Sequence, residues 1–231
     1  MYYARTVDPT ILTAVHELGS VQSCPTVNDM MKMERLLQYV SSHQHHGIRF
    51  HASCMQLQIQ SDASYLSRPK ARSVAGGIHY LGSTEFINGP IYCTSKIIKC
   101  VVSSAAEAEL GAAFMNGQKG AQFRNTLMEL GYPQEPTALL VDNTVAEGLA
   151  SDTINAKRSK SMDVRFFWLR DRVQKAQFYM KHLKGCWNIS DFFTKSLPKD
   201  KFQQFTPYTI VEVDGSIPHP KRQTVRTDKF F

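Results

Sequence analysis

CMQLQIQSD, residues 54–62, is the stretch of sequence that decides the fold. Apolar side chains at Met55, Leu57 and Ile59 alternate with glutamines, which is the period of a strand with one apolar face. The run brings Asp62 to the end of that strand. A central strand buried on both faces should be apolar throughout, so we expect the glutamine face to be partly open or imperfectly covered by the N-terminal helices.

Two shorter strands follow along the chain. Residues 76–83, GGIHYLGS, and residues 89–96, GPIYCTSK, are rich in aromatic and β-branched residues and are separated by TEFIN. This pattern indicates antiparallel strands that continue a meander. We therefore predict three successive antiparallel strands.

A long helix is predicted from SSAAEAEL at residues 103–110, where Ser103 or Ser104 can cap its N-terminus. Its residues recur at intervals of three, four or seven and predict one inward stripe: Leu110, Phe114, Gly117, Ala121 and Met128. A strand follows in TALLVDN, residues 137–143, with Asp142 at its C-terminal end. Open α/β sheets place functional groups at such strand ends.

The remaining segments complete an α/β sheet. We predict a short helix at 144–152, an amphipathic helix at 163–176 with Phe167 and Trp168 in the core, a strand at 178–185, and a short helix at 189–198. The predicted fold class is α/β with a mixed five-stranded sheet and helices on both faces. The first three strands are antiparallel, and the others are joined by parallel crossovers.

The chain divides into three predicted segments. Residues 1–50 form two helices, one opened by Pro9 and one capped by Thr26 or Asn28, before the tract SHQHHGIRFH, which we interpret as a solvated turn. Residues 51–205 form the α/β domain. Residues 206–231 hold one hairpin strand and then a basic tail, of which we expect about the last fifteen residues to be mobile.

The composition favours one well-buried domain with extra segments, since 42% of the 231 residues are hydrophobic. Lys and Arg number 27 against 20 Asp and Glu, and the formal charge of +7 favours nucleic acid or an anionic membrane surface as a partner. No apolar stretch approaches the roughly 18 to 20 residues that span a bilayer. No signal peptide opens the chain either. We expect a soluble intracellular protein, cytoplasmic or in virus-like particles, with nuclear access left open.

Four acidic residues stand at the ends or beginnings of these predicted elements: Asp62, Glu109, Asp142 and Asp191. A metal-binding acidic cluster can assemble from such positions, and the spacing suggests a magnesium-dependent nuclease. Each residue also has a plainer interpretation. The aspartates are common turn formers and helix caps, and Glu109 can interact with its helix dipole, with Glu107 as a competitor for the ligand role.

Several blocks of sequence occur together in one order: SDASY, ARSVAGG, SSAAEAELGAA, VDN, KRSKSMDVRFFWLRDRV and ISDFFTKSLP. Together they resemble the ribonuclease H domain that ends the polyprotein of copia-type retrotransposons, over residues 55–200. Residues 1–50 resemble the helical end of the reverse transcriptase region that precedes this domain. The resemblance implies that the α/β domain is ribonuclease H-like.

The resemblance implies metal-dependent hydrolysis of the RNA strand in RNA–DNA hybrids during reverse transcription, with Mg²⁺ as cofactor and Mn²⁺ as an alternative. Asp62 would bridge two ions, Glu109 and Asp142 would hold one, and Asp191 would hold the other. The partners would be the hybrid and the reverse transcriptase region of the same polyprotein, with no membrane.

Basic residues near these blocks are candidates for contacts with the phosphate backbone, which set affinity without reading sequence. They are Lys96, Lys99, Lys157, Arg158, Lys160 and Lys195. A solvated basic face is an equally good explanation for any single one of them. His182 and Asn188 flank the last strand and are candidates for contact with the site.

Two departures from the family leave alternatives open. Ser161 stands where the family usually has a histidine, and Ser196 stands where it has a proline. The first departure motivates a second hypothesis, a catalytically silent retroelement-derived domain that binds nucleic acid or associates with a polymerase. A third hypothesis, a transposase or integrase core, is disfavoured because the glutamate lies between the first two aspartates, whereas an integrase places its glutamate last.

Overall fold

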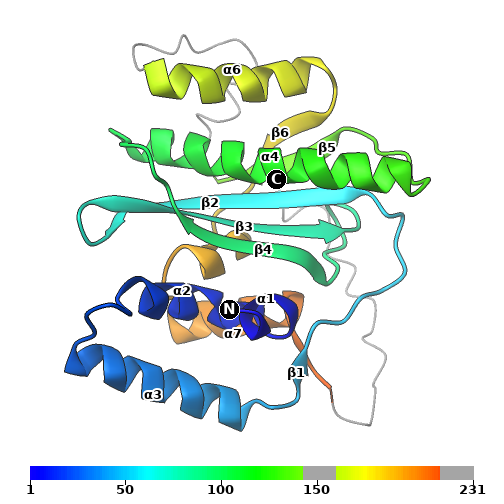
Figure 1. Ribbon diagram of the computed structural model, residues 1–231. Helices are drawn as coiled ribbons and strands as arrows, with labels where there is room; N and C mark the ends of the chain where they lie inside the picture. Colours follow the sequence, from blue (N-terminus) through cyan, green and yellow to red (C-terminus); the bar gives the residue numbers. More distant parts are fainter. Residues whose placement is uncertain (143–159, 214–231) are drawn as a thin grey trace.

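A five-stranded mixed sheet forms the centre of the molecule (Figure 1). The computed structural model describes residues 1–142 and 160–213, with the side chains of residues 160–163 excepted. The strand order is β4-β3-β2-β5-β6. The strands are β2 (Leu57–Arg68), β3 (Arg72–Leu81), β4 (Pro90–Ile97), β5 (Thr137–Val141) and β6 (Phe178–His182).

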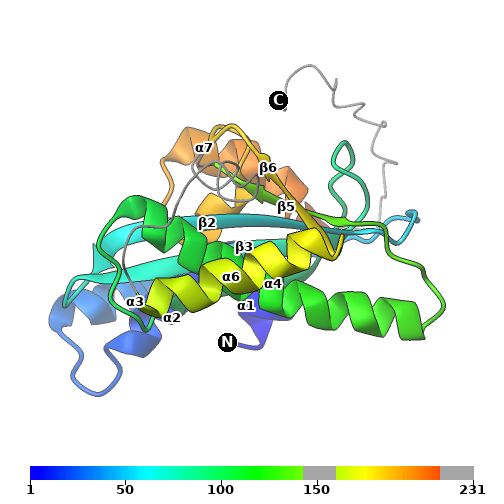
Figure 2. The same ribbon diagram turned by 90° about the horizontal axis from the view of Figure 1, so that it is seen from above.

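The pairing of the strands confirms the predicted fold class. β2, β3 and β4 pair antiparallel, whereas β5 pairs parallel with β2 and β6 pairs parallel with β5. Helices cover both faces of the sheet (Figures 1 and 2). This is the mixed five-stranded α/β arrangement expected from the sequence. The helix predicted at 144–152 and the tail beyond residue 213 lie outside the described residues.

One face of the sheet is covered by α4 (Ala105–Glu129), with α6 (Lys160–Gln174) packed on α4. The Ser104 hydroxyl caps α4 by accepting a hydrogen bond from the Glu107 amide, as the sequence predicts. Gly120 lets α4 approach the sheet, because a Cβ there would lie 2.4 Å from Ile59 Cδ1. A large apolar core fills this interface.

Two predicted core positions on this face are wrong. Met128 is 47% exposed, and its neighbour Leu127 is buried instead. Phe167 is 57% exposed, whereas Trp168 packs against the core as predicted. A helix of 3.6 residues per turn buries only one stripe, so an error of one position moves a side chain from the core to solvent.

The opposite face of the sheet is covered by short elements from both ends of the chain (Figure 1). From the N-terminus come α1 (Tyr3–Thr6), η1 (Pro9–Ile11) and α2 (Leu12–Ser20), and from the C-terminal part come η2 (Ile189–Phe193), α7 (Lys199–Phe205) and η3 (Thr206–Tyr208). They share one apolar core with β3 and β4. The first 20 residues therefore pack on the sheet.

The helix α3 (Val27–Ser42) forms an outer layer over this face. Thr26 caps it in a reciprocal arrangement with Asp29, which settles the choice between Thr26 and Asn28. Glu17 in α2 ties this layer to the tip of the β2–β3 hairpin. Its carboxylate lies 2.8 Å from Lys32 Nζ on α3 and 2.5 Å from Arg68 Nη1 on β2.

The two glutamines within β2 are buried, so the expected partly open face is wrong there, whereas Gln56, just before β2, is half-buried. Gln58 is 7% exposed and Gln60 is 1% exposed. Gln60 Oε1 accepts a hydrogen bond from the Ile189 amide at 2.9 Å, which joins β2 to η2. A buried glutamine is tolerated there because its polar group is used to hold the covering element.

The histidine-rich tract and the C-terminal strand form a small second sheet. In it β1 (His46–Gly47) pairs antiparallel with β7 (Val211–Glu212). The predicted hairpin strand thus pairs with a distant segment. His46 Nδ1 lies 3.3 Å from the buried Asp8 Oδ2, so the predicted solvated turn is partly a buried contact. Among the helices of the described part, none has the length and apolarity to cross a membrane.

Candidate metal centre

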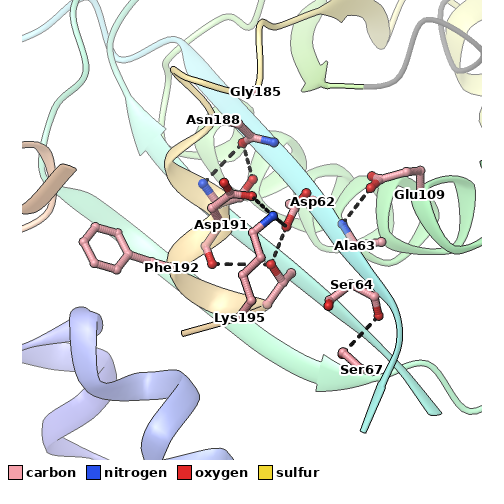
Figure 3. Close-up of polar contacts among 12 residues, drawn as sticks. Asp62, Ala63, Ser64, Ser67, Glu109, Gly185, Asn188, Asp191, Phe192 and Lys195 are labelled. Carbon is pink, nitrogen blue, oxygen red and sulfur yellow. Dashed lines mark hydrogen bonds and ion pairs between the residues drawn. The ribbon is translucent and has the colours of Figure 1, made fainter. Parts of the chain in front are cut away.

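The sheet brings the predicted acidic residues to one end. In the parallel pair of β2 and β5, Ser61 lies opposite Val141, so Asp62 lies level with Asp142, which directly follows the end of β5. The predicted strand end at Asp62 is wrong, because β2 continues to Arg68 through its pairing with β3. Asp191 reaches them from η2, and Glu109 reaches them from α4 (Figure 3). Four segments far apart in the sequence thus supply one carboxylate each.

Three of these carboxylates are close enough to share a cation. One oxygen from each of Asp62, Asp142 and Asp191 lies within 4.8 Å of the others. Asp62 and Asp191 are only 1% and 2% exposed, and Asp142 is half-buried. Burial of like charges at this distance is unfavourable unless a cation neutralises them.

Glu109 stands beside this group. Its Oε1 accepts a hydrogen bond from the Ala63 amide at 3.1 Å, one residue beyond Asp62 (Figure 3). Its Oε2 is buried and has no hydrogen-bond partner among the described residues. Glu107, the competing candidate, points elsewhere, since its Oε2 accepts from the Ser103 amide at 2.6 Å at the start of α4.

The position of Asp191 depends on how η2 is held against β2. Asn188 donates through Nδ2 to the Ser61 carbonyl at 3.1 Å, and its Oδ1 accepts from the Ser190 amide. Gly76, opposite Asp62 in β3, makes room, because a Cβ there would lie 2.6 Å from Thr194 Cγ2 and 2.9 Å from Ser190 O. The fold therefore needs a glycine at this position of β3 for Asp191 to reach Asp62.

Two lysines and a threonine contact the carboxylates. Lys195 Nζ lies 2.8 Å from Asp191 Oδ1 and 4.0 Å from Asp62 Oδ2. Lys201 Nζ contacts the other oxygen of Asp191, and Thr194 Oγ1 donates to Asp62 Oδ2. Two ammonium groups thus face a cluster of four carboxyl groups in the described part of the chain.

The electrostatics of the site reflect this excess of acid. Burial, and then the neighbouring Asp191, raise the pKa of Asp62 well above its ordinary value. Burial, Asp62 and Asp142 raise the pKa of Glu109 to about 9. Burial and Asp191 likewise raise the pKa of Asp142. Perturbed carboxyl groups gathered in one place are typical of functional sites.

The residues that flank the last strand have structural contacts. His182 Nε2 lies 3.1 Å from the Asp142 carbonyl oxygen, so the ring supports the backbone at the end of β5. Asn188 is fully buried and caps η2. Neither side chain belongs to the group of converging ligand atoms.

The predicted basic contacts lie in different places. Lys96 and Lys99 are exposed at and after the end of the edge strand β4. Lys195 lies in the acidic site itself. Lys157 and Arg158 lie outside the described residues, and so does the side chain of Lys160, as well as that of Ser161.

The donor set fits a hard divalent cation. All the converging atoms are carboxylate oxygens, the ligands that Mg²⁺ and Mn²⁺ accept, and no softer ligand joins them in the described residues. The buried, unpartnered Glu109 Oε2 is a further oxygen beside the group. We conclude that the residues present are suited to hold such an ion.

Sequence reasoning missed the residues that arrange the acids. Gln60, Gly76, Thr194 and Lys201 all touch the site or the element that carries it. The only signal for Gln60 was its polar side chain in a strand that should be apolar. Nothing near Lys201 in the sequence indicates a contact with Asp191.

Comparisons with known proteins agree with the predicted resemblance. No protein-family model matches the sequence. The Retrovirus-related Pol polyprotein from transposon RE1 of Arabidopsis thaliana is 27% identical over 208 residues, 89% of this chain and 14% of the polyprotein. The Retrovirus-related Pol polyprotein from transposon TNT 1-94 of Nicotiana tabacum is 32% identical over 118 residues, 51% of this chain and 9% of the polyprotein. The resemblance to retrotransposon Pol polyproteins is thereby confirmed, and the chain spans only a small part of their length.

Solved structures are also similar to this chain. The crystal structure of LC11-RNase H1 in complex with RNA/DNA hybrid is 12% identical, with a TM-score of 0.47. The match covers 60% of this chain and 93% of that one.

Proposed function

We propose that this chain is a metal-dependent endonuclease that hydrolyses the RNA strand of RNA–DNA hybrids, as part of retrotransposon reverse transcription. One observation supports the proposal most. Oxygens of Asp62, Asp142 and Asp191 converge within 4.8 Å at one end of the sheet, with Glu109 beside them. The similarity to retrotransposon Pol polyproteins adds the biological setting.

The four carboxylates would hold the metal. Mg²⁺ held by these residues would supply an activated water, charge neutralisation on the phosphate and support for the leaving oxygen. Asp62 would be one of these ligands, and its Oδ2 is oriented by the Thr194 hydroxyl. Glu109 is oriented through one oxygen by the Ala63 amide, and its other oxygen has no hydrogen-bond partner in the described residues.

The substrate class follows from charge and from the relatives. A formal charge of +7 favours a polyanion. Exposed Lys96 and Lys99 remain our candidates for contacts with the phosphate backbone, which position a duplex without reading its sequence. Discrimination for RNA would come from the 2′-hydroxyl, which only the cleaved strand carries. The remainder of such a polyprotein, including its reverse transcriptase region, is the proposed partner.

A second candidate function is a catalytically silent domain that binds nucleic acid. The contacts of Lys195 and Lys201 with Asp191 favour it, because two ammonium groups already neutralise part of the acidic cluster. The two candidates predict the same fold and differ only in metal binding and cleavage.

The test offers the purified chain four duplexes of one sequence, in which the two strands are RNA–DNA, DNA–RNA, RNA–RNA or DNA–DNA. Each hybrid carries an end label on its RNA strand, and each of the other two duplexes carries it on one strand. The buffer holds Mg²⁺ or EDTA. The proposal predicts cutting of the RNA strand in both hybrids only, with Mg²⁺ and with 5′-phosphate and 3′-hydroxyl ends. Cutting of the DNA–DNA duplex, or equal cutting in EDTA, would contradict it. Binding of the hybrids without cutting, in Mg²⁺ and in Mn²⁺, would favour the silent domain.

A further inference from the structure

Asp191 is the one carboxylate of the cluster that contacts two ammonium groups in the described structure. Lys195 Nζ lies 2.8 Å from its Oδ1, and Lys201 Nζ contacts its Oδ2. The side chain of Asp191 is 2% exposed, so these contacts are largely removed from water. Both lysines therefore act on the same potential metal ligand, but they do so from different surroundings.

Lys201 is held from several directions. Besides Asp191, its ammonium donates to the Gly185 carbonyl at 3.2 Å and lies 5.2 Å from the centre of the Phe205 ring. Its side chain is 28% exposed, and its helix α7 is anchored by the buried Phe205. These contacts fix Lys201 independently of the acidic cluster.

Within the described residues, the ion pairs of Lys195 are all with the cluster. Its ammonium pairs with Asp191 and, at 4.0 Å, with Asp62 Oδ2, two of the three carboxylates whose oxygens converge (Figure 3). Its side chain is 46% exposed. The neighbouring carboxylates raise the pKa of Lys195 in spite of partial burial, so it is charged at neutral pH. The Lys195 ammonium thus lies between two carboxylates, as a bound cation would.

We propose that Lys195 is an internal counter-cation that occupies the acidic cluster while it is free of metal and leaves it when a divalent ion binds. Lys201 stays on Asp191 and is a positioning residue. The inference rests on the proposed function only in that the cluster binds a divalent ion. A divalent ion and the Lys195 ammonium compete for the same oxygens, because each neutralises the same charges.

A groove beside the cluster can accept the displaced Lys195 side chain. Lys195 also lines a groove of about 380 Å³ together with Ser67 and Arg68 of the β2–β3 hairpin and with Thr194 and Ser196. In that groove its ammonium is next to the cluster but no longer inside it. Metal binding would thus expose a cation beside the site, where a phosphate of the substrate can use it.

Titration of the purified chain with MgCl₂ in a calorimeter, without nucleic acid, tests the inference. The variants are Lys195→Gln, which removes the competing charge, Lys195→Arg, which keeps it, and Lys175→Gln, which removes an exposed charge after α6. We expect Lys195→Gln to bind Mg²⁺ at least about tenfold more tightly than wild type, since the ion no longer has to break an ion pair of this length. Lys195→Arg should stay within about threefold of wild type because it keeps the charge, and Lys175→Gln should do so because solvent and salt screen the charge that it removes.

Lys201→Gln separates the two roles. As a positioning residue, Lys201 should not tighten Mg²⁺ binding when it is replaced, since the loss of order in Asp191 offsets the loss of a positive charge. Lys201→Arg should restore the wild-type affinity. Equal tightening in Lys195→Gln and Lys201→Gln would overturn the division of roles.

The remaining outcomes are also decisive. Measurable Mg²⁺ binding with unchanged affinity in Lys195→Gln overturns the inference and leaves the proposed function intact. Absence of Mg²⁺ binding to the folded wild type and to Lys195→Gln overturns both. Circular dichroism of each variant shows whether it is folded, and Lys195→Met provides a second neutral replacement if Lys195→Gln is not.

Discussion

Two buried polar clusters meet in one strand, at Ser61 and Asp62, and they are built on opposite principles. Ser61 belongs to a neutral network on the α4 side, in which Asn116 Nδ2 lies 2.9 Å from both Ser61 Oγ and the Gly76 carbonyl. Asp62 belongs to the acidic cluster on the η2 side. The Asn116 Nδ2 group of the first network finds its acceptors within the chain, although Asn116 Oδ1 has no hydrogen-bond partner among the described residues. The second cluster has more carboxyl groups than ammonium groups in the described part of the chain.

The difference teaches what each cluster is for. Buried neutral groups that donate to each other stabilise a fold, because breaking one bond leaves a partner unsatisfied. Buried carboxyl groups in excess of their counter-charges reduce stability and are retained where an external cation completes them. The comparison therefore predicts opposite effects on stability when one member of each cluster is removed.

The largest effect is expected from Asp62→Asn. Because the change removes a proposed metal ligand at almost no change in volume, hydrolysis of the hybrid should fall at least roughly a thousandfold. The free energy of unfolding of the metal-free chain should stay the same or rise, because one of several like charges is gone. Urea unfolding in EDTA and an initial-rate assay measure the two quantities. Asp171→Asn, at an exposed carboxylate on α6, is the matched control for both.

The neutral cluster should behave in the opposite way. Asn116→Ala removes the donor of Ser61 Oγ and Gly76 O and leaves a small cavity in a fully buried position. We expect a loss of about 2 to 4 kcal/mol in the free energy of unfolding. Asn125→Ala, at an exposed position of the same helix, should cost less than about 1 kcal/mol in urea unfolding. An Asn116→Ala chain with an unchanged free energy of unfolding would contradict the proposed difference between the two clusters.

A change of pH should have a smaller effect on the stability of the metal-free chain. The pKa of Glu109 is raised to about 9 from an ordinary 4.5, and the pKa of Asp62 is raised as well. The folded chain therefore holds these protons more tightly than the unfolded chain. The protonated carboxyl groups therefore contribute to the free energy of unfolding. This contribution is fully present below about pH 4 and is lost as the pH rises through the raised pKa values.

Melting temperatures in EDTA between pH 5 and pH 9 measure this loss of stability. In Glu109→Gln the loss should be smaller, because one of the two titrating groups is absent. Added Mg²⁺ should restore more stability at pH 9 than at pH 5, because the ligands must be deprotonated to bind it. A melting temperature that rises steadily toward pH 9 in EDTA would count against an acidic cluster of this kind.

The smallest effect is expected from Glu107→Gln. Glu107 caps the start of α4 through the Ser103 amide and does not reach the cluster. Hydrolysis should remain within about twofold of wild type, and stability should fall by less than about 1 kcal/mol, as for a helix N-terminal charge. The rate assay that detects Asp62→Asn serves here too. A large loss of hydrolysis would exchange the roles of Glu107 and Glu109.

The sequence predicted the sheet because its signals are local. Alternation in residues 54–62 and the Ser104 cap depend on neighbours along the chain, and both are present in the structure. The strand predicted at 76–83 is also present, but it begins at Arg72, so its glycines lie inside β3 and do not bound it. The four acids could be named because predicted elements and the order of sequence blocks are read along the chain, although Asp62 lies within β2 and not at its end.

What surrounds the acids could not be predicted, because it depends on packing between distant segments. Gln60 is buried since η2, more than a hundred residues later, needs its carbonyl oxygen. Gly76 is required by the approach of Thr194, and Lys201 meets Asp191 only after α7 has folded back. Phe167 and Met128 were misplaced because a helical period fixes a stripe and not the exact residue within it.

The most direct test of the account compares wild type and Asp142→Asn in one experiment. Both chains are mixed with an RNA–DNA hybrid that is end-labelled on the RNA strand, at increasing Mg²⁺, and binding of the hybrid is followed in parallel. The account predicts cleavage by wild type that rises with Mg²⁺, and retained binding but at least about a thousandfold slower cleavage by Asp142→Asn. Equal cleavage by both chains, or none by a folded wild type that binds the hybrid in Mg²⁺ and in Mn²⁺, would contradict it.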